Sequence, residues 1–351
     1  MSRQIADTRI RKTTPLVNPG TLAQEFPVDE DVASFIGDAR DQVAAILRGD
    51  DPRVLAIVGP CSIHDPKALL EFAGKLKARE DSLKDAVYPV LRAYFEKPRT
   101  VIGWKGLIND PDLDGSFRVN HGLQLARGLL RQVAELRIAA ATEFLDTTLG
   151  QYYADLISFG AIGARTVESQ IHRELASGLS MPVGFKNATS GDVAVAIDAI
   201  RSAHESHWFP SLTHDGNPAI LQASGNADSY LILRGGKDSG PNYSAPFVDA
   251  AAANMRDAGI EPGIIVDCSH GNSEKDPQRQ PIVLSDVCAQ LERGQNAIRG
   301  VMIESHLVAG SQSIGPREAL VYGQSITDAC LAWEDTQPLL EQLATAVRRS
   351  R

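Results

Sequence analysis

Eight short apolar runs, rich in β-branched residues, recur along most of the chain, and each is followed by a stretch long enough to form a helix. The apolar runs cover residues 53–58, 86–94, 137–144, 156–164, 181–185, 229–234, 262–267 and 298–304. The helix-like stretches cover residues 66–80, 119–135, 147–156, 168–178, 191–204, 246–258, 282–293 and 326–348. This alternation is typical of buried parallel strands that are joined by helical crossovers.

Eight strand–helix units in a chain of 351 residues favour a closed (β/α)8 barrel of the TIM class. An open doubly wound α/β sheet is the alternative. The chain contains neither of the glycine-rich nucleotide-binding patterns that often accompany that fold. We therefore expect a single barrel domain over residues 1–351.

Two segments do not fit a bare barrel. Residues 1–50 combine a polar arm, which is interrupted by prolines and a glycine, with a helix around residues 38–48. Residues 205–228 contain two short apolar runs on either side of a turn-prone His-Asp-Gly-Asn, which predicts an inserted β-hairpin. We expect both segments to be additions to the barrel, the first of them an N-terminal regulatory arm and helix.

Charge and hydropathy exclude several classes of function. The net charge of −9 argues against nucleic-acid binding, which needs a basic face. No apolar stretch approaches the roughly 18 residues that a membrane span needs. The first residues lack the apolar core of a signal peptide, and the four cysteines are widely spaced. We expect a cytoplasmic protein without disulfides.

Ionisable or ligating side chains follow almost every predicted strand. They are Cys61, Arg92, Lys97, Arg99, Glu143, Arg165, Lys186, Arg234, Lys237, His270 and Glu304. Packing gives no reason for such groups at these positions. In a (β/α)8 barrel the carboxyl ends of the strands build the active site. The pattern therefore predicts one shared polar cavity.

Six of the basic residues among them form a set of cations that should converge, namely Arg92, Lys97, Arg99, Arg165, Lys186 and Arg234. Guanidinium groups match carboxylate and phosphate oxygens in pairs, and lysine adds a compact charge. Converging cations repel one another unless anions bind between them. This set of cations therefore predicts that the cavity binds a phosphorylated acid or two phosphorylated substrates. The alternative for any one residue is an ion pair with a neighbouring acidic side chain.

A second group combines Cys61, His270 and Glu304 with Asp328 as a further candidate. Thiolate, imidazole and carboxylate together suit a divalent transition metal. Each residue also has a structural explanation. Cys61 could be a small core residue, and Asp328 could cap a helix that begins near Ser325. Cys268 follows the same strand as His270 and is a rival ligand.

Two further segments are expected to contact substrate. Residues 94–117 are long and dense in glycine, proline and polar groups, which is typical of a loop that covers substrate. Gly163 and Ala164 stand between a strand and a helix. Small residues there let backbone N–H groups approach a phosphate.

The longest motifs resemble those of one family, the class I, microbial-type 3-deoxy-D-arabino-heptulosonate 7-phosphate (DAHP) synthases. The motifs are GPCSIHDP (59–66), YFEKPRT (94–100), GWKGLINDPDLDGS (103–116), GAIGART (160–166), PVGFKN (182–187), LRGGK (233–237), DCSHGNS (267–273) and SITDAC (325–330). The resemblance implies a transferase that condenses phosphoenolpyruvate with erythrose 4-phosphate and releases phosphate, in the first step of aromatic amino acid biosynthesis through the shikimate pathway.

The resemblance also implies roles for individual residues. The metal ligands would be Cys61, His270, Glu304 and Asp328, in place of Cys268, and the ion Mn²⁺, Fe²⁺, Co²⁺ or Zn²⁺. Phosphoenolpyruvate would contact Arg92, Lys97, Glu143, Gly163, Ala164, Arg165, Lys186 and Arg234. Erythrose 4-phosphate would contact Lys97, Pro98, Arg99 and Thr100. Lys97, Cys61 and His270 would be catalytic, with Lys97 able to reach both substrates and transfer a proton.

The resemblance also implies that the enzyme is regulated. The family implies feedback inhibition by an aromatic amino acid, and the sequence favours tryptophan. The effector site would lie near Gln151, Ser180 and Ser211, beside the arm and the hairpin. A homodimer or homotetramer is expected. The rival interpretations are the related synthesis of 3-deoxy-manno-octulosonate 8-phosphate from arabinose 5-phosphate, a metal-dependent aldolase, and a catalytically inactive amino acid sensor.

Overall fold

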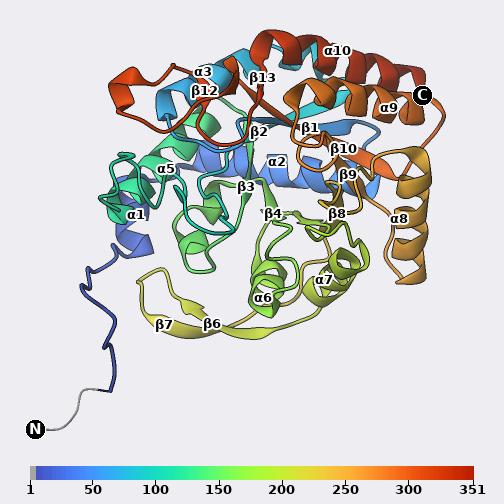
Figure 1. The fold of residues 1–351 in the computed structure, drawn as a ribbon. Helices are drawn as coiled ribbons and strands as arrows, with labels where there is room; N and C mark the ends of the chain where they lie inside the picture. The colour runs from blue at the N-terminus through green and yellow to red at the C-terminus, as the bar shows by residue number, and fades with distance from the viewer. Residues whose placement is uncertain (1–4) are drawn as a thin grey trace, which may run out of the picture.

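The computed structural model describes residues 5–351, and eight parallel strands within this range close into a barrel (Figure 1). Neighbouring strands pair in sequence order, and the eighth pairs with the first. The strands are β1 (Val54–Gly59), β2 (Val87–Arg92), β3 (Ala139–Glu143), β4 (Phe159–Ile162), β5 (Val183–Lys186), β8 (Ser229–Leu233), β9 (Ile264–Asp267) and β10 (Ile298–His306). The barrel that the strand pattern predicted is confirmed, and the open sheet is excluded.

Side chains alternate between the inside and the outside of the barrel. In β1, Leu55 and Ile57 belong to the interior cluster, whereas Val54, Ala56 and Val58 pack outward against the helices. The strands are buried on both faces, and this explains why they appear in the sequence as continuous apolar runs.

Helix α2 (Glu30–Arg48) closes one end of the barrel. Val43 and Leu47 of this helix pack in the interior cluster, and the Leu47 carbonyl lies against Gly263, just before β9 begins. The helix therefore covers the amino ends of the strands, which leaves the carboxyl ends free to form a site.

The remaining helices surround the barrel (Figure 1). They are α3 (Pro66–Lys77), α4 (Glu80–Leu83), α5 (Val119–Glu135), α6 (Gln170–Gly178), α7 (Ala194–His204), α8 (Ala245–Asp257), α9 (Gln280–Glu292) and α10 (Trp333–Arg349). Short 3-10 turns are η1 (Leu149–Tyr152), η2 (Ala154–Leu156), η3 (Pro277–Arg279) and η4 (Arg317–Ala319). Between residues 5 and 351, no helix has the length and apolar character needed to cross a membrane.

The arm is more regular than the sequence indicated. It contains α1 (Pro19–Glu25), with Asn18 as its N-cap. Helix α2 begins at residue 30 rather than near 38, because the Asp29 carboxylate accepts a hydrogen bond from the backbone N–H of Val32. The predicted helix over 147–156 is instead the pair of turns η1 and η2.

The last helix also begins later than predicted, at Trp333. The preceding residues form β12 (Gln324–Ser325), which pairs with β11 (Val308–Ser311), and β13 (Leu331–Ala332), which pairs with β10. Asp328 therefore lies in the loop between β12 and β13, not in a helix cap. The prediction of a helix from 326 was wrong because strand pairing holds this segment extended.

The inserted hairpin is confirmed. Strands β6 (Trp208–Leu212) and β7 (Pro218–Gln222) pair antiparallel and lie beside α6, outside the barrel (Figure 1). Gly216 occupies the turn with a φ of +76°. The hairpin also contacts the arm, because the backbone N–H of Gly20 donates to the carbonyl of His214.

Candidate active site

A cavity of about 350 Å³ lies at the carboxyl ends of the barrel strands. Its walls include Cys61, Arg92, Glu143, Ala164, Arg165, Lys186, Arg234, His270 and Asp328, and its rim includes Lys97, Pro98, Arg99 and Thr100. These residues come from nearly every strand end of the barrel. The structure thus brings together side chains that are up to 267 positions apart in sequence.

Arg92 lies at the floor of this cavity and is almost completely buried. Its Nε donates to the Pro60 carbonyl at 3.1 Å, and its Nη2 donates to Glu304 Oε1 at 2.9 Å. The guanidinium carbon lies 3.5 Å from the centre of the Tyr94 ring. Among the described residues nothing accepts a hydrogen bond from Nη1, so this buried donor is available to an anion.

Lys186 and Glu143 form a second buried pair in this cavity, with Nζ 3.3 Å from Oε2. Burial would raise the pKa of Glu143, but Lys186 and then Arg92 outweigh it and hold that pKa below its usual value. Glu143 is therefore ionised and fixes the position of the Lys186 ammonium. Gly163 is packed against this carboxylate, because a Cβ at that position would lie 2.3 Å from Glu143 Oε1.

Arg165 and Arg234 add cations nearer to the opening. Arg165 is exposed, and its Nη2 donates to Thr100 Oγ1 at 3.3 Å. Arg234 is held through its backbone N–H, which donates to Asn187 Oδ1 at 2.8 Å. Burial lowers the pKa of Arg234, against the opposing effect of Asp267. Binding of an anion would restore a favourable environment for this charge.

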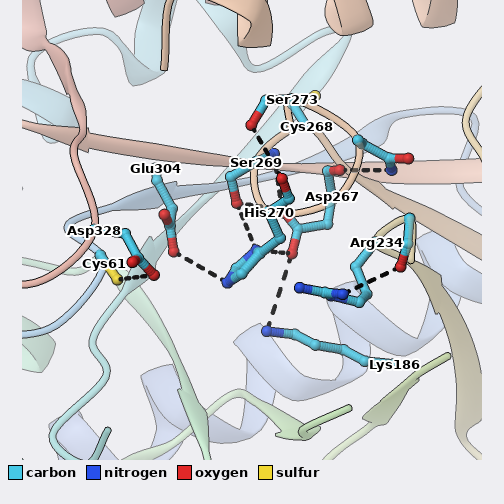
Figure 2. Close-up of polar contacts among 12 residues, drawn as sticks. Cys61, Lys186, Arg234, Asp267, Cys268, Ser269, His270, Ser273, Glu304 and Asp328 are labelled. Atoms are coloured by element: carbon cyan, nitrogen blue, oxygen red, sulfur yellow. Dashed lines mark hydrogen bonds and ion pairs between the residues drawn. The ribbon is translucent and has the colours of Figure 1, made fainter. Parts of the chain in front are cut away.

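Three metal-capable side chains meet beside the cations. The ligand atoms of Cys61, Glu304 and Asp328 lie within 4.8 Å of one another. His270 stands outside this group but adjoins it, because its Nε2 lies 3.5 Å from Glu304 Oε1 (Figure 2). Cys268 does not join them. It packs in the outer core, where its Sγ faces the Val266 carbonyl.

Lys97 connects the metal-capable group to the rim. Its Nζ lies 2.8 Å from both Cys61 Sγ and Asp328 Oδ2. Burial would lower the pKa of Lys97, but Cys61, Glu304 and Asp328 together raise it above its ordinary value. In return, Lys97 holds the pKa of Asp328 low despite that residue's burial. Cys61, Glu304 and Asp328 therefore favour a positive charge at the edge of this cavity, and their ligand atoms lie close enough together to hold a metal ion.

The comparisons with known proteins agree with this geometry. A sequence model of the DAHP synthetase I family matches residues 25–341. The chain belongs to this family. A solved structure of phospho-2-dehydro-3-deoxyheptonate aldolase from Francisella tularensis superposes on this family member with a TM-score of 0.95 at 50% identity, over 97% of this chain and 99% of the other.

Relatives of this chain differ in the regulation that their names state. The Phe-sensitive phospho-2-dehydro-3-deoxyheptonate aldolase of Escherichia coli is 52% identical over the full length of both chains. The Trp-sensitive enzyme of Salmonella typhi is 53% identical over 97% of each chain. Overall similarity therefore does not distinguish the two regulatory types.

A second cavity, of about 290 Å³, lies between α1, η1, η2 and α6. Gln151 and Ser180 line it, together with Arg40 and Arg127. Ser211 is on β6 and lies outside its lining, although Phe209 of the same strand lines an adjoining hollow with Gln151 and Ser180. Two of the three predicted effector residues thus share one cavity.

Several residues of the site were not singled out in the sequence. Tyr94, Glu96 and Lys275 line the cavity, and Asp267 lies beneath His270. Asp267 could have been noticed, because a carboxylate at the end of an apolar strand has no packing role. Tyr94 gave no such signal, since a tyrosine at a strand end is ordinary.

Proposed function

We propose that the chain is a DAHP synthase, which joins phosphoenolpyruvate to erythrose 4-phosphate and releases phosphate. The observation that carries this proposal is one cavity whose cations adjoin a metal-capable group. C3 of phosphoenolpyruvate attacks the aldehyde carbon of erythrose 4-phosphate and forms the new bond. Water adds at C2, and the resulting hemiketal phosphate loses inorganic phosphate.

The cations divide between the two substrates. Phosphoenolpyruvate lies among Arg92, Arg165, Lys186 and Arg234, with Glu143, Gly163 and Ala164 beside them. Arg92 Nη1 supports this placement, because it is buried and has no acceptor among the described residues. Erythrose 4-phosphate lies along Lys97, Pro98, Arg99 and Thr100 on the rim. Holding both substrates in register lowers the entropic cost of their encounter.

The donor set fits a divalent ion. Cys61, His270, Glu304 and Asp328 would supply one thiolate, one imidazole and two carboxylates, a mixture that suits Mn²⁺, Fe²⁺, Co²⁺ or Zn²⁺. Burial raises the pKa of the Cys61 thiol, so its thiolate depends on a cation beside it. An ion bound there would supply Lewis acidity toward the aldehyde oxygen.

Lys97 is the residue that transfers the proton. Its raised pKa keeps the ammonium charged, and this form can donate to an oxygen that gains negative charge. Cys61 and Asp328 accept hydrogen bonds from its Nζ and so aim it at the boundary between the two substrate sites. Lys97, Cys61 and His270 are therefore the proposed catalytic set.

A phosphate-release assay tests the proposal. We expect phosphate from phosphoenolpyruvate only when erythrose 4-phosphate and a divalent metal are both present. Chelation should stop the release, and added metal should restore it. Phosphate release without the aldehyde would instead indicate a phosphatase.

The second cavity is the proposed effector site for an aromatic amino acid, with tryptophan favoured over phenylalanine and tyrosine. Arg40 on its wall, beside Gln151 and Ser180, supports binding of an amino acid carboxylate, whereas Arg127 is already paired with Asp155. Ser211 would have to act from the neighbouring hairpin. Inhibition titrations with the three amino acids decide between them, and inhibition by tyrosine alone would contradict the assignment.

We further propose a cytoplasmic homodimer or homotetramer. Trp208 and Ile220 support this, because they lie on one face of the hairpin and are 65% and 73% exposed. Sedimentation equilibrium measures the assembly directly, and a monomer at micromolar concentration would exclude it.

A further inference from the structure

Asp267 is a buried carboxylate for which the proposed chemistry has no use. It is the last residue of β9 and is 0% exposed. Its Oδ2 lies 2.9 Å from His270 Nδ1 and 4.0 Å from Lys186 Nζ (Figure 2). Burying a carboxylate is costly unless its neighbours need the charge. The neighbours of Asp267 are His270, a candidate metal ligand, and Lys186, a cation of the proposed phosphoenolpyruvate site.

The hydrogen bonds around Asp267 determine which nitrogen of His270 carries a proton. Asp267 Oδ1 accepts the hydroxyl proton of Ser269 at 2.6 Å. Ser269 Oγ lies 2.7 Å from His270 Nδ1, and its only proton is already donated, so it can only accept there. Asp267 Oδ2, the other neighbour of Nδ1, is also an acceptor. Nδ1 must therefore carry a proton, which in the neutral imidazole leaves the lone pair on Nε2.

The orientation of the imidazole is fixed as well. His270 has a φ of +55°, a backbone conformation that is unfavourable for a residue with a side chain. The turn is held because Asp267 Oδ1 accepts from the Ser269 backbone N–H at 3.0 Å, and the Asp267 carbonyl accepts from Asn272 Nδ2 at 2.8 Å. This turn directs Nε2 toward Glu304 (Figure 2).

We infer that Asp267, assisted by Ser269, is the positioning residue that presents the Nε2 lone pair of His270 to the metal. The inference rests on the proposed function, because it requires the metal site. Partners of this kind fix the tautomer and ring orientation of a ligating histidine, and losing one typically weakens metal binding 10- to 100-fold. Through Lys186, the same carboxylate also connects the metal site with the phosphoenolpyruvate site.

Metal affinity of the variant D267N is the test. Asparagine keeps the shape of the side chain but replaces one carboxylate oxygen with an NH₂ group, which is a hydrogen-bond donor. In either orientation this NH₂ group faces other donors, namely Nδ1–H of His270 or the hydroxyl and backbone N–H of Ser269. We expect the affinity for Zn²⁺, measured by competition with a fluorescent chelator on metal-free protein, to fall about 10- to 100-fold. In Co²⁺-loaded protein the thiolate charge-transfer band from Cys61 should persist, while the d–d bands change because the imidazole is displaced.

The matched control is C268A. Cys268 is the next residue, equally buried, and contacts the outer core rather than the imidazole. It should bind Zn²⁺ like the wild type. If C268A and D267N lose the same Zn²⁺ affinity, the cause is general damage at the end of the strand, and the inference fails. It also fails if D267N keeps the wild-type affinity and the wild-type Co²⁺ spectrum.

Two other outcomes also decide the question. If D267N does not fold, S269A replaces it, since it removes one acceptor of Nδ1 while the carboxylate stays. A wild-type affinity and Co²⁺ spectrum in S269A would then overturn the inference. If the wild-type protein binds no metal, both the metal site and the proposed function are contradicted. If D267N binds metal as the wild type does, only the inference about Asp267 is contradicted.

Discussion

At the scale of single residues, charge explains most of the site. Each buried cation at the cavity floor has a carboxylate partner, Glu304 for Arg92 and Glu143 for Lys186. The sequence predicted which residues would converge, because a barrel brings the carboxyl ends of its strands together. It could not predict these pairings, since partners such as Arg92 and Glu304 are 212 positions apart.

Removing the Cys61 thiol should remove metal-supported turnover. The variant C61A leaves Glu304 and Asp328 without their sulfur neighbour, so activity should fall to the level of the chelated wild type. The variant C288A is the control, because Cys288 is buried in the outer core on α9. Turnover and bound metal are measured together, and full activity of C61A without metal would contradict the assignment.

Arg165 offers a test of anion binding that spares the fold. It is exposed, and its guanidinium donates a hydrogen bond to the hydroxyl of Thr100, another residue of the cavity, so R165A should fold normally. A hydrogen bond to a charged group is worth about 1.5–3 kcal/mol, so the KM for phosphoenolpyruvate should rise at least tenfold. R201A, which removes an exposed arginine on α7, serves as control. An unchanged KM in R165A would exclude Arg165 from the phosphoenolpyruvate site.

Glu96 makes the stability of the protein depend on pH. Burial raises its pKa from 4.5 to about 7, so the folded state keeps a proton that the unfolded state releases. Stability should therefore fall as pH rises from 4.5 to 7, by up to about 3 kcal/mol. E96Q should remove this contribution, so its stability relative to the wild type should increase between pH 5 and pH 7.5. Urea unfolding of both proteins measures this, and a difference that is constant with pH would refute it.

At the scale of elements, strands were easier to predict than the segments that carry ligands. Buried strands leave an apolar signal because both of their faces are covered. The loop that carries Asp328 leaves none, since it is held by distant pairing of β12 with β11 and of β13 with β10. The sequence therefore predicted Asp328 at the start of a helix, and its place in this loop was not foreseen, although the residue was already a candidate metal ligand.

The turn after β4 provides a test at this scale. In G163A the new Cβ would lie 2.3 Å from Glu143 Oε1, so the carboxylate must move and Lys186 with it. A displacement of about 1 Å in a positioned group can cost on the order of 10²-fold, and kcat/KM for phosphoenolpyruvate should fall accordingly. G74A is the matched control. Its Cβ meets open space on α3, and it should be as active as the wild type and slightly more stable.

At the scale of the whole molecule, an acidic protein encloses a basic cavity. The net charge of −9 gave no hint of anionic substrates, because it sums over a surface that the site does not use. Barrel closure concentrates the cations at one end, while α2 closes the other. The hairpin and the arm lie outside the barrel, beside the cavity lined by Gln151 and Ser180. The proposed catalytic and effector sites thus lie in two different cavities of the chain.

The central claim is that one cavity joins two phosphorylated substrates with the help of a metal. The most direct measurement follows phosphoenolpyruvate consumption, phosphate release and the mass of the product with erythrose 4-phosphate or arabinose 5-phosphate as acceptor. The account predicts a seven-carbon sugar acid phosphate, formed from erythrose 4-phosphate with one phosphate released per product, and only with metal. Turnover with arabinose 5-phosphate alone, or equal turnover after complete removal of metal, would contradict it.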